Sequence, residues 1–302
     1  MLKLLEAIRP TTLIEPLRLR NHLGIDVTIA SETFQHTGSF KFRAAYNLAS
    51  SVSNESILTA SSGNFGQALA YACKLIGKSC TVVMPDTSAK VKIDAVRSFG
   101  ATVDLIDTNV IGRNERVEQL AAEMPEAYFA SAYDDRFVIE GNASLGGELA
   151  DKGFDAFISP IGGGGLISGL AIGVRRNSSS AAIYGAEPIL GNDAARSLAA
   201  GKIIKNEKEP LTIADGARTI SVGNLNFPII QKEVAKIVEV SDETLAKAVR
   251  MYFDLANLKV EPTGALSLGA VLKNPEEFRS KTVCLIASGG NVDPNVYKSL
   301  LG

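Results

Sequence analysis

Short runs of β-branched and apolar residues alternate with segments of helical periodicity over most of the chain, and this alternation restricts the fold strongly. A first series predicts strands at 56–60, 80–85 and 102–106, with helices at 66–76 and 89–99. A second series predicts strands at 154–159, 181–187, 236–240 and 282–287, with helices at 166–176 and 242–255. A repeat of about twenty residues is typical of parallel strands joined by crossover helices. We therefore expect an α/β fold of two lobes, each with an open, mostly parallel twisted sheet flanked by helices.

The two series also suggest how the chain divides into domains. With 302 residues, 46% of them hydrophobic and 21% charged, the chain is long enough to build two hydrophobic cores. We expect a large domain made of residues 1–50 and 141–302, and a small domain made of residues 51–140. The stretch 201–226 has weak periodicity and many polar residues, so it is predicted to be a loop.

Charge and hydropathy exclude several kinds of partner and location. The 31 Lys and Arg residues nearly balance the 33 Asp and Glu residues, and no block of like charge occurs, so nucleic acid and anionic membranes are not expected as partners. The N-terminus lacks the pattern of a secretory signal, and the apolar run 162–174 is too short to span a bilayer. Cys73, Cys80 and Cys284 are scattered in apolar segments, which indicates buried thiols in a reducing compartment such as the cytoplasm.

Lys41 stands among aromatic and small apolar residues in the stretch 37–47, where a lysine has little structural purpose. Burial favours the neutral amine, which is the form that attacks a carbonyl and forms a Schiff base. The alternative is that Lys41 lies in the first turn of a helix that begins near Ser39, with its amine in water. The lysine alone does not decide between the two.

The strand at 154–159 runs into four consecutive glycines, 162–165, followed by a helix that begins at Leu166. Backbone N–H groups and the helix dipole form an anion site at such a junction, and glycine lets a phosphate approach the backbone. A dinucleotide-binding motif needs a third glycine, which is absent here, although Glu187 could serve as the acidic residue that such a motif has about 20 residues further on. The sequence also contains no P-loop. A monophosphate is therefore predicted, in preference to a turn that merely packs.

Three further stretches carry groups that could act in a site. Ser61, Ser62, Gly63 and Asn64 lie between a strand and a helix and could hold a carboxylate, although a plain N-cap turn is an equal alternative. Glu187 and Asp193 flank a turn and would suit a divalent cation, although solvated surface acids are the commoner explanation. Ser288 places a hydroxyl at the end of the last strand, where α/β sheets bind ligands. His22 and His36 occur in no zinc-binding pattern.

These features occur in the order found in one family. The chain closely resembles the fold type II pyridoxal-phosphate (PLP) enzymes, in the branch of the serine/threonine dehydratases and serine racemases. The resemblance spans nearly the whole chain and rests on the stretches 38–43, 61–64, 84–86, 90–100, 162–166, 212–216, 261–264 and 288–291.

The resemblance implies a role for each candidate residue, with PLP in the cleft between the lobes. Lys41 would form the Schiff base and Phe40 would lie against the cofactor, while Asn64 would bind the phenolic oxygen and Ser288 the pyridine nitrogen. Gly162, Gly163, Gly164, Gly165 and the N–H of Leu166 would hold the phosphate. Ser61, Ser62, Gly63 and Asn64 would bind the substrate. Glu187, the carbonyl of Gly191 and Asp193 would match the Mg²⁺ or Ca²⁺ site of the racemases.

The implied activity is α,β-elimination by an ammonia-lyase on a β-hydroxy-L-amino acid such as threonine or serine, giving a 2-oxo acid and ammonia. The alternatives are an amino-acid racemase, with Ser62 as the second acid, and a nucleotide-binding module without catalysis. Phe65 and Asn142 depart from the histidine and glutamine usual in the branch, and both are interpreted as lying near the substrate. Relatives are commonly homodimers, so a homodimer is expected.

Overall fold

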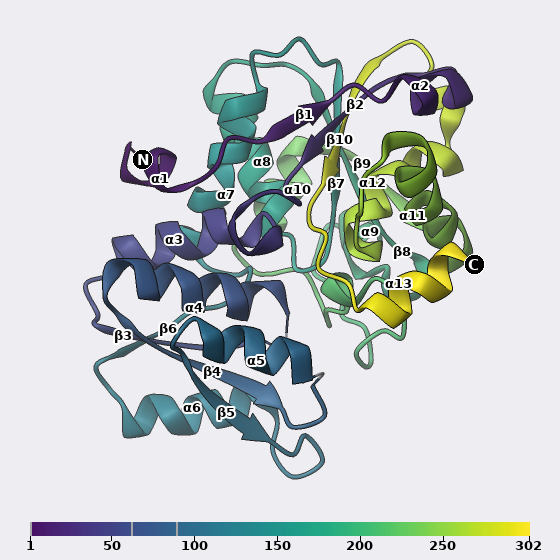
Figure 1. The fold of residues 1–302 in the computed structure, drawn as a ribbon. Coiled ribbons are helices and arrows are strands. Elements are labelled where there is room, and N and C mark those ends of the chain that lie inside the picture. Colours follow the sequence, from purple (N-terminus) through teal and green to yellow (C-terminus); the bar gives the residue numbers. More distant parts are fainter. Residues whose placement is uncertain (1, 62, 89) are drawn as a thin grey trace.

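The computed structural model describes residues 2–61, 63–88 and 90–302, and its strands form two separate sheets. The larger, six-stranded sheet has the order β1-β2-β10-β7-β8-β9 (Figure 1). Its strands are β1 (Thr12–Ile14), β2 (Asp26–Ser31), β7 (Ala156–Pro160), β8 (Ala182–Pro188), β9 (Val234–Val240) and β10 (Thr282–Ala287). Among the described strands only the pair β1 and β2 is antiparallel, so the sheet is mostly parallel, as predicted.

The smaller, four-stranded sheet has the order β5-β4-β3-β6, and its paired strands are parallel. Its strands are β3 (Ser56–Ala60), β4 (Ser79–Pro85), β5 (Thr102–Ile106) and β6 (Ala127–Phe129). The predicted two-lobed α/β architecture is therefore confirmed. The strands predicted at 56–60, 102–106 and 282–287 have the observed bounds.

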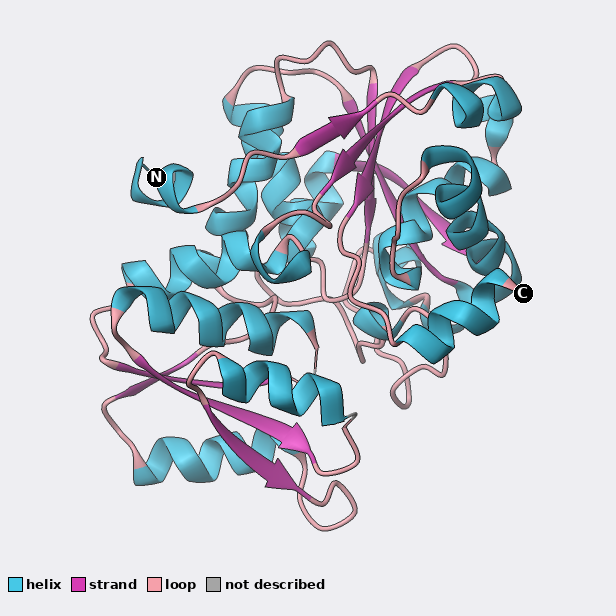
Figure 2. Cartoon of the chain, in the orientation of Figure 1, coloured by secondary structure: helices cyan, strands magenta, loops and turns pink. Residues whose placement is uncertain are grey.

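Helices cover both faces of each sheet (Figures 1 and 2). Around the small sheet they are α4 (Asn64–Ile76), α5 (Lys90–Ser98) and α6 (Arg113–Glu123). Elsewhere they are α1 (Leu2–Ala7), α2 (Leu17–Leu23), α3 (Lys41–Ser51), α7 (Arg136–Leu149), α8 (Gly165–Arg176), α9 (Asp193–Ala200), α10 (Phe227–Glu233), α11 (Asp242–Ala256), α12 (Pro262–Lys273) and α13 (Pro294–Leu301). Helix α3 packs against both α4 and α7, so it lies where the two lobes meet.

Helix α7 was not expected from the sequence, because three of its residues are glycines, which disfavour an isolated helix. Packing explains them. A Cβ on Gly146 would lie 2.3 Å from the carbonyl oxygen of Leu170 in α8, and a Cβ on Gly173 of α8 would lie 2.1 Å from that of Ala143 in α7. The two helices approach so closely that tertiary contact outweighs the local preference.

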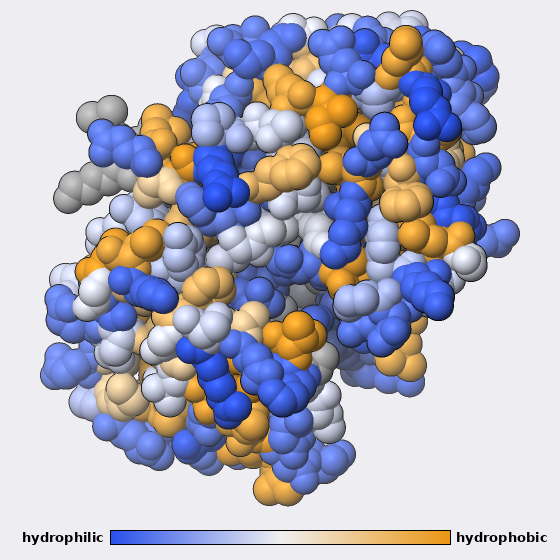
Figure 3. Space-filling model, viewed as in Figure 1, coloured by the Kyte–Doolittle hydropathy of each residue, from blue (hydrophilic) through white to orange (hydrophobic). Residues whose placement is uncertain are grey.

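Each sheet has its own hydrophobic cores, formed mainly by aliphatic side chains of the strands and the helices over them. All three cysteines are buried and free, as predicted. Within the described residues, no helix is long and apolar enough to cross a membrane. On the face drawn in Figure 3, the surface is hollowed where the two lobes meet.

Candidate active site

Lys41 is the first residue of α3, at the boundary between the lobes. Its Nζ donates a hydrogen bond to the carbonyl oxygen of Ala132, 2.7 Å away. The same atom lies 5.0 Å from the ring centroid of Phe40 and 5.6 Å from that of Phe65. Although the residue as a whole is partly accessible, burial of the amine lowers the Lys41 pKa to about 8, and the charge of Glu261 opposes this shift only in part. The amine thus lies inside the protein rather than in bulk water.

A buried ion-pair network fixes the start of α3. The guanidinium of Arg43 is completely buried and lies 2.8 Å from the carboxylate of Glu32 and 2.6 Å from that of Glu148. It also donates to the hydroxyl of Thr11. Burial alone would lower the Arg43 pKa, but the two carboxylates raise it. Because the network joins the residue after β2 to α3 and α7, it holds the helix that carries Lys41 in one place.

The four glycines join β7 to α8, and the structure shows why side chains are excluded there. Gly164 has φ +90°, a backbone conformation that favours glycine. A Cβ on Gly163 would lie 2.2 Å from the ring of Tyr133. The N–H groups at the start of a helix have no intrahelical acceptor, so those of Gly165 and Leu166 are available to an anion.

Two buried asparagines hold the carbonyl groups of this turn, and sequence reasoning did not assign them to it. Asn226 Nδ2 donates to the carbonyl oxygens of Gly163 (2.9 Å) and Tyr133 (3.0 Å). Asn142 Nδ2 donates to that of Gly165, at 3.0 Å. Packing of α7 on α8 directs the Asn142 amide to the glycine turn, and the interpretation of Asn142 as lying near the substrate stays a prediction.

The loop 131–135 connects the lysine to the glycine turn, and it too was missed. Its Ala132 carbonyl accepts from Lys41, and its Tyr133 ring covers Gly163. The carboxylate of Asp134 accepts from the N–H groups of Asn224 and Leu225. Nothing in the local sequence indicates these contacts, since the partners lie about thirty to ninety residues away along the chain.

The predicted carboxylate cradle lies at the N-terminus of α4. Ser61 Oγ accepts from the N–H groups of Gly66 (3.1 Å) and Gly63 (3.4 Å), so its hydroxyl caps the helix start. Asn64 Nδ2 donates to both carboxylate oxygens of Glu261, at 2.9 and 3.2 Å. Ser62 lies outside the described residues.

Ser288 follows β10 directly, where the strand end meets the segment before α3. Its carbonyl oxygen accepts from the N–H of Phe40 at 2.9 Å, so Ser288 and Lys41 are close in space. Ser288 is buried, with 1% of its surface exposed. A hydroxyl at the carboxyl end of a strand is well placed to bind a ligand, because α/β sheets bind their ligands at this edge.

Glu187 and Asp193 are both buried, so the alternative of solvated surface acids is wrong. The Glu187 carboxylate accepts from the N–H groups of Ala194 and Ala195. Burial raises the pKa of Glu187 to about 8, which these hydrogen bonds partly oppose, and that of Asp193 to about 6. In the residues that the structure describes, no group of three acidic, histidine or cysteine side chains could hold a metal ion.

Comparison with known proteins identifies the family. The family described as "Pyridoxal-phosphate dependent enzyme" matches residues 4–289, and the chain therefore belongs to it. The predicted fold type II architecture is confirmed. The crystal structure of the T.th. threonine deaminase has a TM-score of 0.88 and 37% identity with this chain, and the match covers 96% of this chain and 95% of that one.

Relatives of known activity place the chain in the predicted branch. An L-threo-3-hydroxyaspartate ammonia-lyase from Pseudomonas sp is 38% identical over 284 residues, which cover 92% of this chain and 88% of that protein. A serine racemase from Schizosaccharomyces pombe is 35% identical over 282 residues, covering 91% of this chain and 87% of that protein. The resemblance to the dehydratase and serine racemase branch is thus confirmed.

Proposed function

We propose that the protein is a PLP-dependent ammonia-lyase that converts a β-hydroxy-L-amino acid to a 2-oxo acid and ammonia. The observation that carries the proposal is the amine of Lys41, which is held between two aromatic rings and has a pKa of about 8. A substantial fraction of a lysine with this pKa is neutral near physiological pH, as a nucleophile or general base requires.

The residues present fit the cofactor. The glycine turn, 162–165, and the N–H of Leu166 would hold the phosphate, and a Cβ at Gly163 would already collide with Tyr133. The hydroxyl of the buried Ser288 would face the pyridine nitrogen, and Phe40 would lie against the ring. When bound, PLP supplies an electron sink for the carbanion formed at the substrate α-carbon.

Residues of the protein would remove the α-proton and bind the substrate carboxylate. Lys41 takes the proton from the substrate α-carbon, because its amine is neutral and desolvated. Ser61, Ser62, Gly63 and Asn64 would hold the substrate carboxylate at the N-terminus of α4, where the helix dipole favours an anion. Departure of the β-hydroxyl group then leaves an enamine that hydrolyses to the 2-oxo acid and ammonia.

The substrate that we favour is a 3-hydroxyaspartate. Two similar proteins, from Pseudomonas sp and Saccharomyces cerevisiae, are L-threo-3-hydroxyaspartate ammonia-lyases, and a third relative is an L-threonine ammonia-lyase. Racemisation is the alternative activity, because serine racemases are similar to the chain to a comparable degree. It would require Ser62 as a second acid, and Ser62→Ala would then abolish racemisation while sparing most of the elimination.

A panel of substrates tests the proposal. The purified protein, saturated with PLP, is incubated with L-threo-3-hydroxyaspartate, L-threonine or L-serine, and 2-oxo acid and ammonia are measured together. We expect equal amounts of both products from at least one substrate, and none from Lys41→Ala. The proposal is wrong if the protein binds PLP but releases neither product from any of them.

We also propose a divalent cation, Mg²⁺ or Ca²⁺, at Glu187, the carbonyl of Gly191 and Asp193. Two buried acids with raised pKa values suit a hard cation, whose charge would favour their ionised forms. Waters would have to complete the coordination. Millimolar Mg²⁺ should raise the melting temperature of the wild type but not that of Asp193→Asn, and equal responses would exclude the site.

The division into domains, the oligomeric state and the cellular location are also proposals. The lobes would be residues 1–50 with 141–302, which bind the cofactor, and residues 51–140. A homodimer is proposed because Leu5, Leu13, Leu17 and Phe34 are exposed in the N-terminal part of the chain. Analytical ultracentrifugation tests this state. A cytoplasmic location fits the three free, buried thiols.

A further inference from the structure

The amide of Asn64 joins the two lobes at the site. Asn64 begins α4, which covers the small sheet, but its amide partners come from the C-terminal part of the chain. Its Nδ2 donates to the carboxylate of Glu261 at 2.9 Å, and its Oδ1 accepts from Asn291 Nδ2 at 2.9 Å. These partners lie 197 and 227 residues away in sequence. Any tilt of the small lobe must therefore stretch or break these hydrogen bonds.

The orientation of the Asn64 amide follows from a backbone group. Asn291 Nδ2 also donates to the carbonyl oxygen of Thr37, at 2.7 Å, and a carbonyl can only accept. This contact fixes which end of the Asn291 amide faces Asn64. As a consequence, the oxygen of Asn64 must face Asn291 and its NH₂ group must face Glu261.

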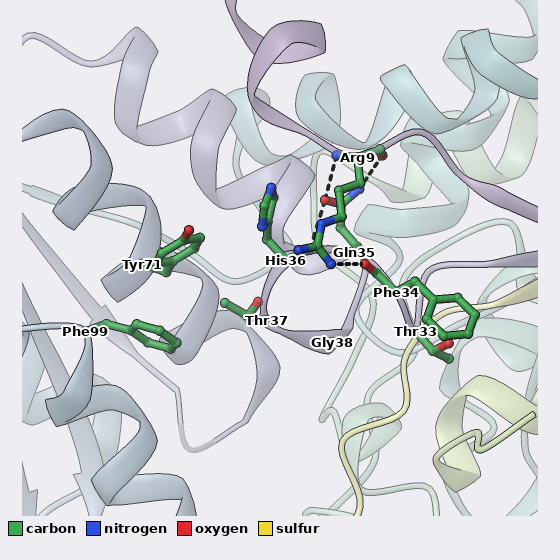
Figure 4. A pocket seen from close by; sticks show the side chains of 9 residues that line it. All are labelled: Arg9, Thr33, Phe34, Gln35, His36, Thr37, Gly38, Tyr71 and Phe99. Carbon is green, nitrogen blue, oxygen red and sulfur yellow. Dashed lines mark hydrogen bonds between the residues drawn. The ribbon is translucent and has the colours of Figure 1, made fainter.

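The Thr37 carbonyl is itself held in a well-anchored loop. Gln35 exchanges two hydrogen bonds with the backbone of Arg9, and the Arg9 guanidinium donates to the carbonyl of Phe34 (Figure 4). Gly38 leaves room for the asparagine, since a Cβ there would lie 2.5 Å from Asn291 Oδ1. The chain of contacts thus runs from the N-terminal segment to the amide of Asn64.

Glu261 is an unusual partner for this amide, because its carboxyl is buried without a paired cation. It is 4% exposed, and no described residue forms an ion pair with it. Burial and the charge of Asp215 raise its pKa to about 8, while the Asn64 hydrogen bond and the charge of Lys92 act in the opposite direction. A buried acid costs stability, so its presence at the site calls for a reason.

We infer that Glu261 is a positioning residue for the cofactor, which acts by holding the NH₂ group of Asn64 in place together with Asn291. An amide nitrogen carries two hydrogens, and the carboxylate needs only one. The second can be donated to the phenolic oxygen that Asn64 would bind. The inference rests on the proposed role of PLP, and Glu261 itself would touch no reacting atom.

Two substitutions at Glu261 distinguish a positioning role from an effect of the carboxylate charge and from a general loss of protein stability. Glu261→Gln keeps an oxygen that accepts from Asn64, whereas Glu261→Leu removes it. The readouts are the dissociation constant of PLP from the apoenzyme, the pH midpoint of the cofactor's visible absorption band, and the apoenzyme melting temperature. We expect Glu261→Leu to raise the dissociation constant about tenfold and to shift the pH midpoint, as loss of an oriented hydrogen bond predicts. Glu261→Gln should stay within about twofold of the wild type.

A double substitution tests whether Glu261 acts through Asn64. If it does, Glu261→Leu combined with Asn64→Ala should bind PLP no more weakly than Asn64→Ala alone, because both remove the same contact. Additive losses would overturn the inference, as would a Glu261→Leu protein with a lower melting temperature but unchanged PLP affinity and absorption. Should Glu261→Leu fail to fold, Asn291→Ala must give the same non-additivity with Asn64→Ala. A wild type that binds no PLP would refute the proposed function instead.

Discussion

Replacing Gly163 by alanine directly tests the proposal that the glycine turn, residues 162–165, binds phosphate. The added Cβ would lie 2.2 Å from two carbon atoms of the Tyr133 ring, a distance at which one of the groups has to move. The turn cannot easily move, because the Gly163 carbonyl accepts from both the Gly223 N–H (3.0 Å) and Asn226 Nδ2 (2.9 Å). The ring is also constrained, since the Tyr133 carbonyl accepts from the same asparagine.

The expected loss follows from these contacts. Overpacking of a rigid site costs about 1–3 kcal/mol, and a hydrogen bond broken by the shift about 0.5–1.5 kcal/mol more. We therefore expect the apoenzyme to lose about 1.5–4.5 kcal/mol of unfolding free energy. Because the shift moves the N–H groups that would bind phosphate, PLP affinity should fall at least about tenfold, which corresponds to about 1.4 kcal/mol.

A matched control is available on α7. A Cβ on Gly147 would meet only Asn177 Nδ2, at 3.6 Å, which is an ordinary contact. Gly147→Ala should therefore leave PLP affinity unchanged and stabilise the helix by about 0.4–1 kcal/mol. Urea unfolding of the apoenzymes and fluorescence titration with PLP measure both quantities. The reasoning is refuted if Gly163→Ala binds PLP within about twofold of the wild type and unfolds at the same urea concentration.

Three further predictions concern the lysine and its surroundings. Arg43→Met should cost about 3–5 kcal/mol in urea unfolding, because it leaves Glu32 buried without its cation; a loss below about 1 kcal/mol would contradict the network. The rate at which the apoenzyme binds PLP, measured by stopped-flow absorbance, should rise with pH with a midpoint near 8, because deprotonation makes the Lys41 amine reactive. A rate that still rises above about pH 9 would show that the amine has the pKa of a lysine in water, and would contradict the prediction. Asn226→Asp replaces a donor by an acceptor beside the turn, so it should weaken PLP much more than pyridoxal, and equal weakening of both would speak against a phosphate site.

The sequence predicted seven of the ten strands because these are short runs rich in apolar and β-branched residues. It did not predict β1, β2 or β6; β1 and β6 have only three residues each, all exposed or half-buried, and β2 is buried at five of its six positions and shows no alternation. The sequence did not predict helices α7 and α12 either, since glycines in both lower the local preference and residues 262–271 of α12 are all buried, so that α12 shows no amphipathic pattern. Their stability comes from neighbours that are distant in the chain.

Local sequence indicates some residues of the candidate site but not others. Lys41, the glycine turn and Ser288 stand at strand or helix ends, where local sequence indicates both position and chemistry. Asn226, Tyr133 and Glu261 act through partners about 60 to 200 residues away, so no local pattern could reveal them. The contact of Asn142 with Gly165 was not predicted for the same reason, because only the packing of α7 on α8 shows where its amide points.

Borohydride reduction of the PLP-loaded protein, followed by peptide mass spectrometry, tests the central claim most directly. If the buried amine at position 41 is the one that bonds to the cofactor, the pyridoxyl-phosphate adduct will be found on the peptide that contains Lys41, at one equivalent per chain, and the visible absorption band will disappear. An adduct spread over surface lysines, or an unmodified Lys41 peptide, would contradict the account.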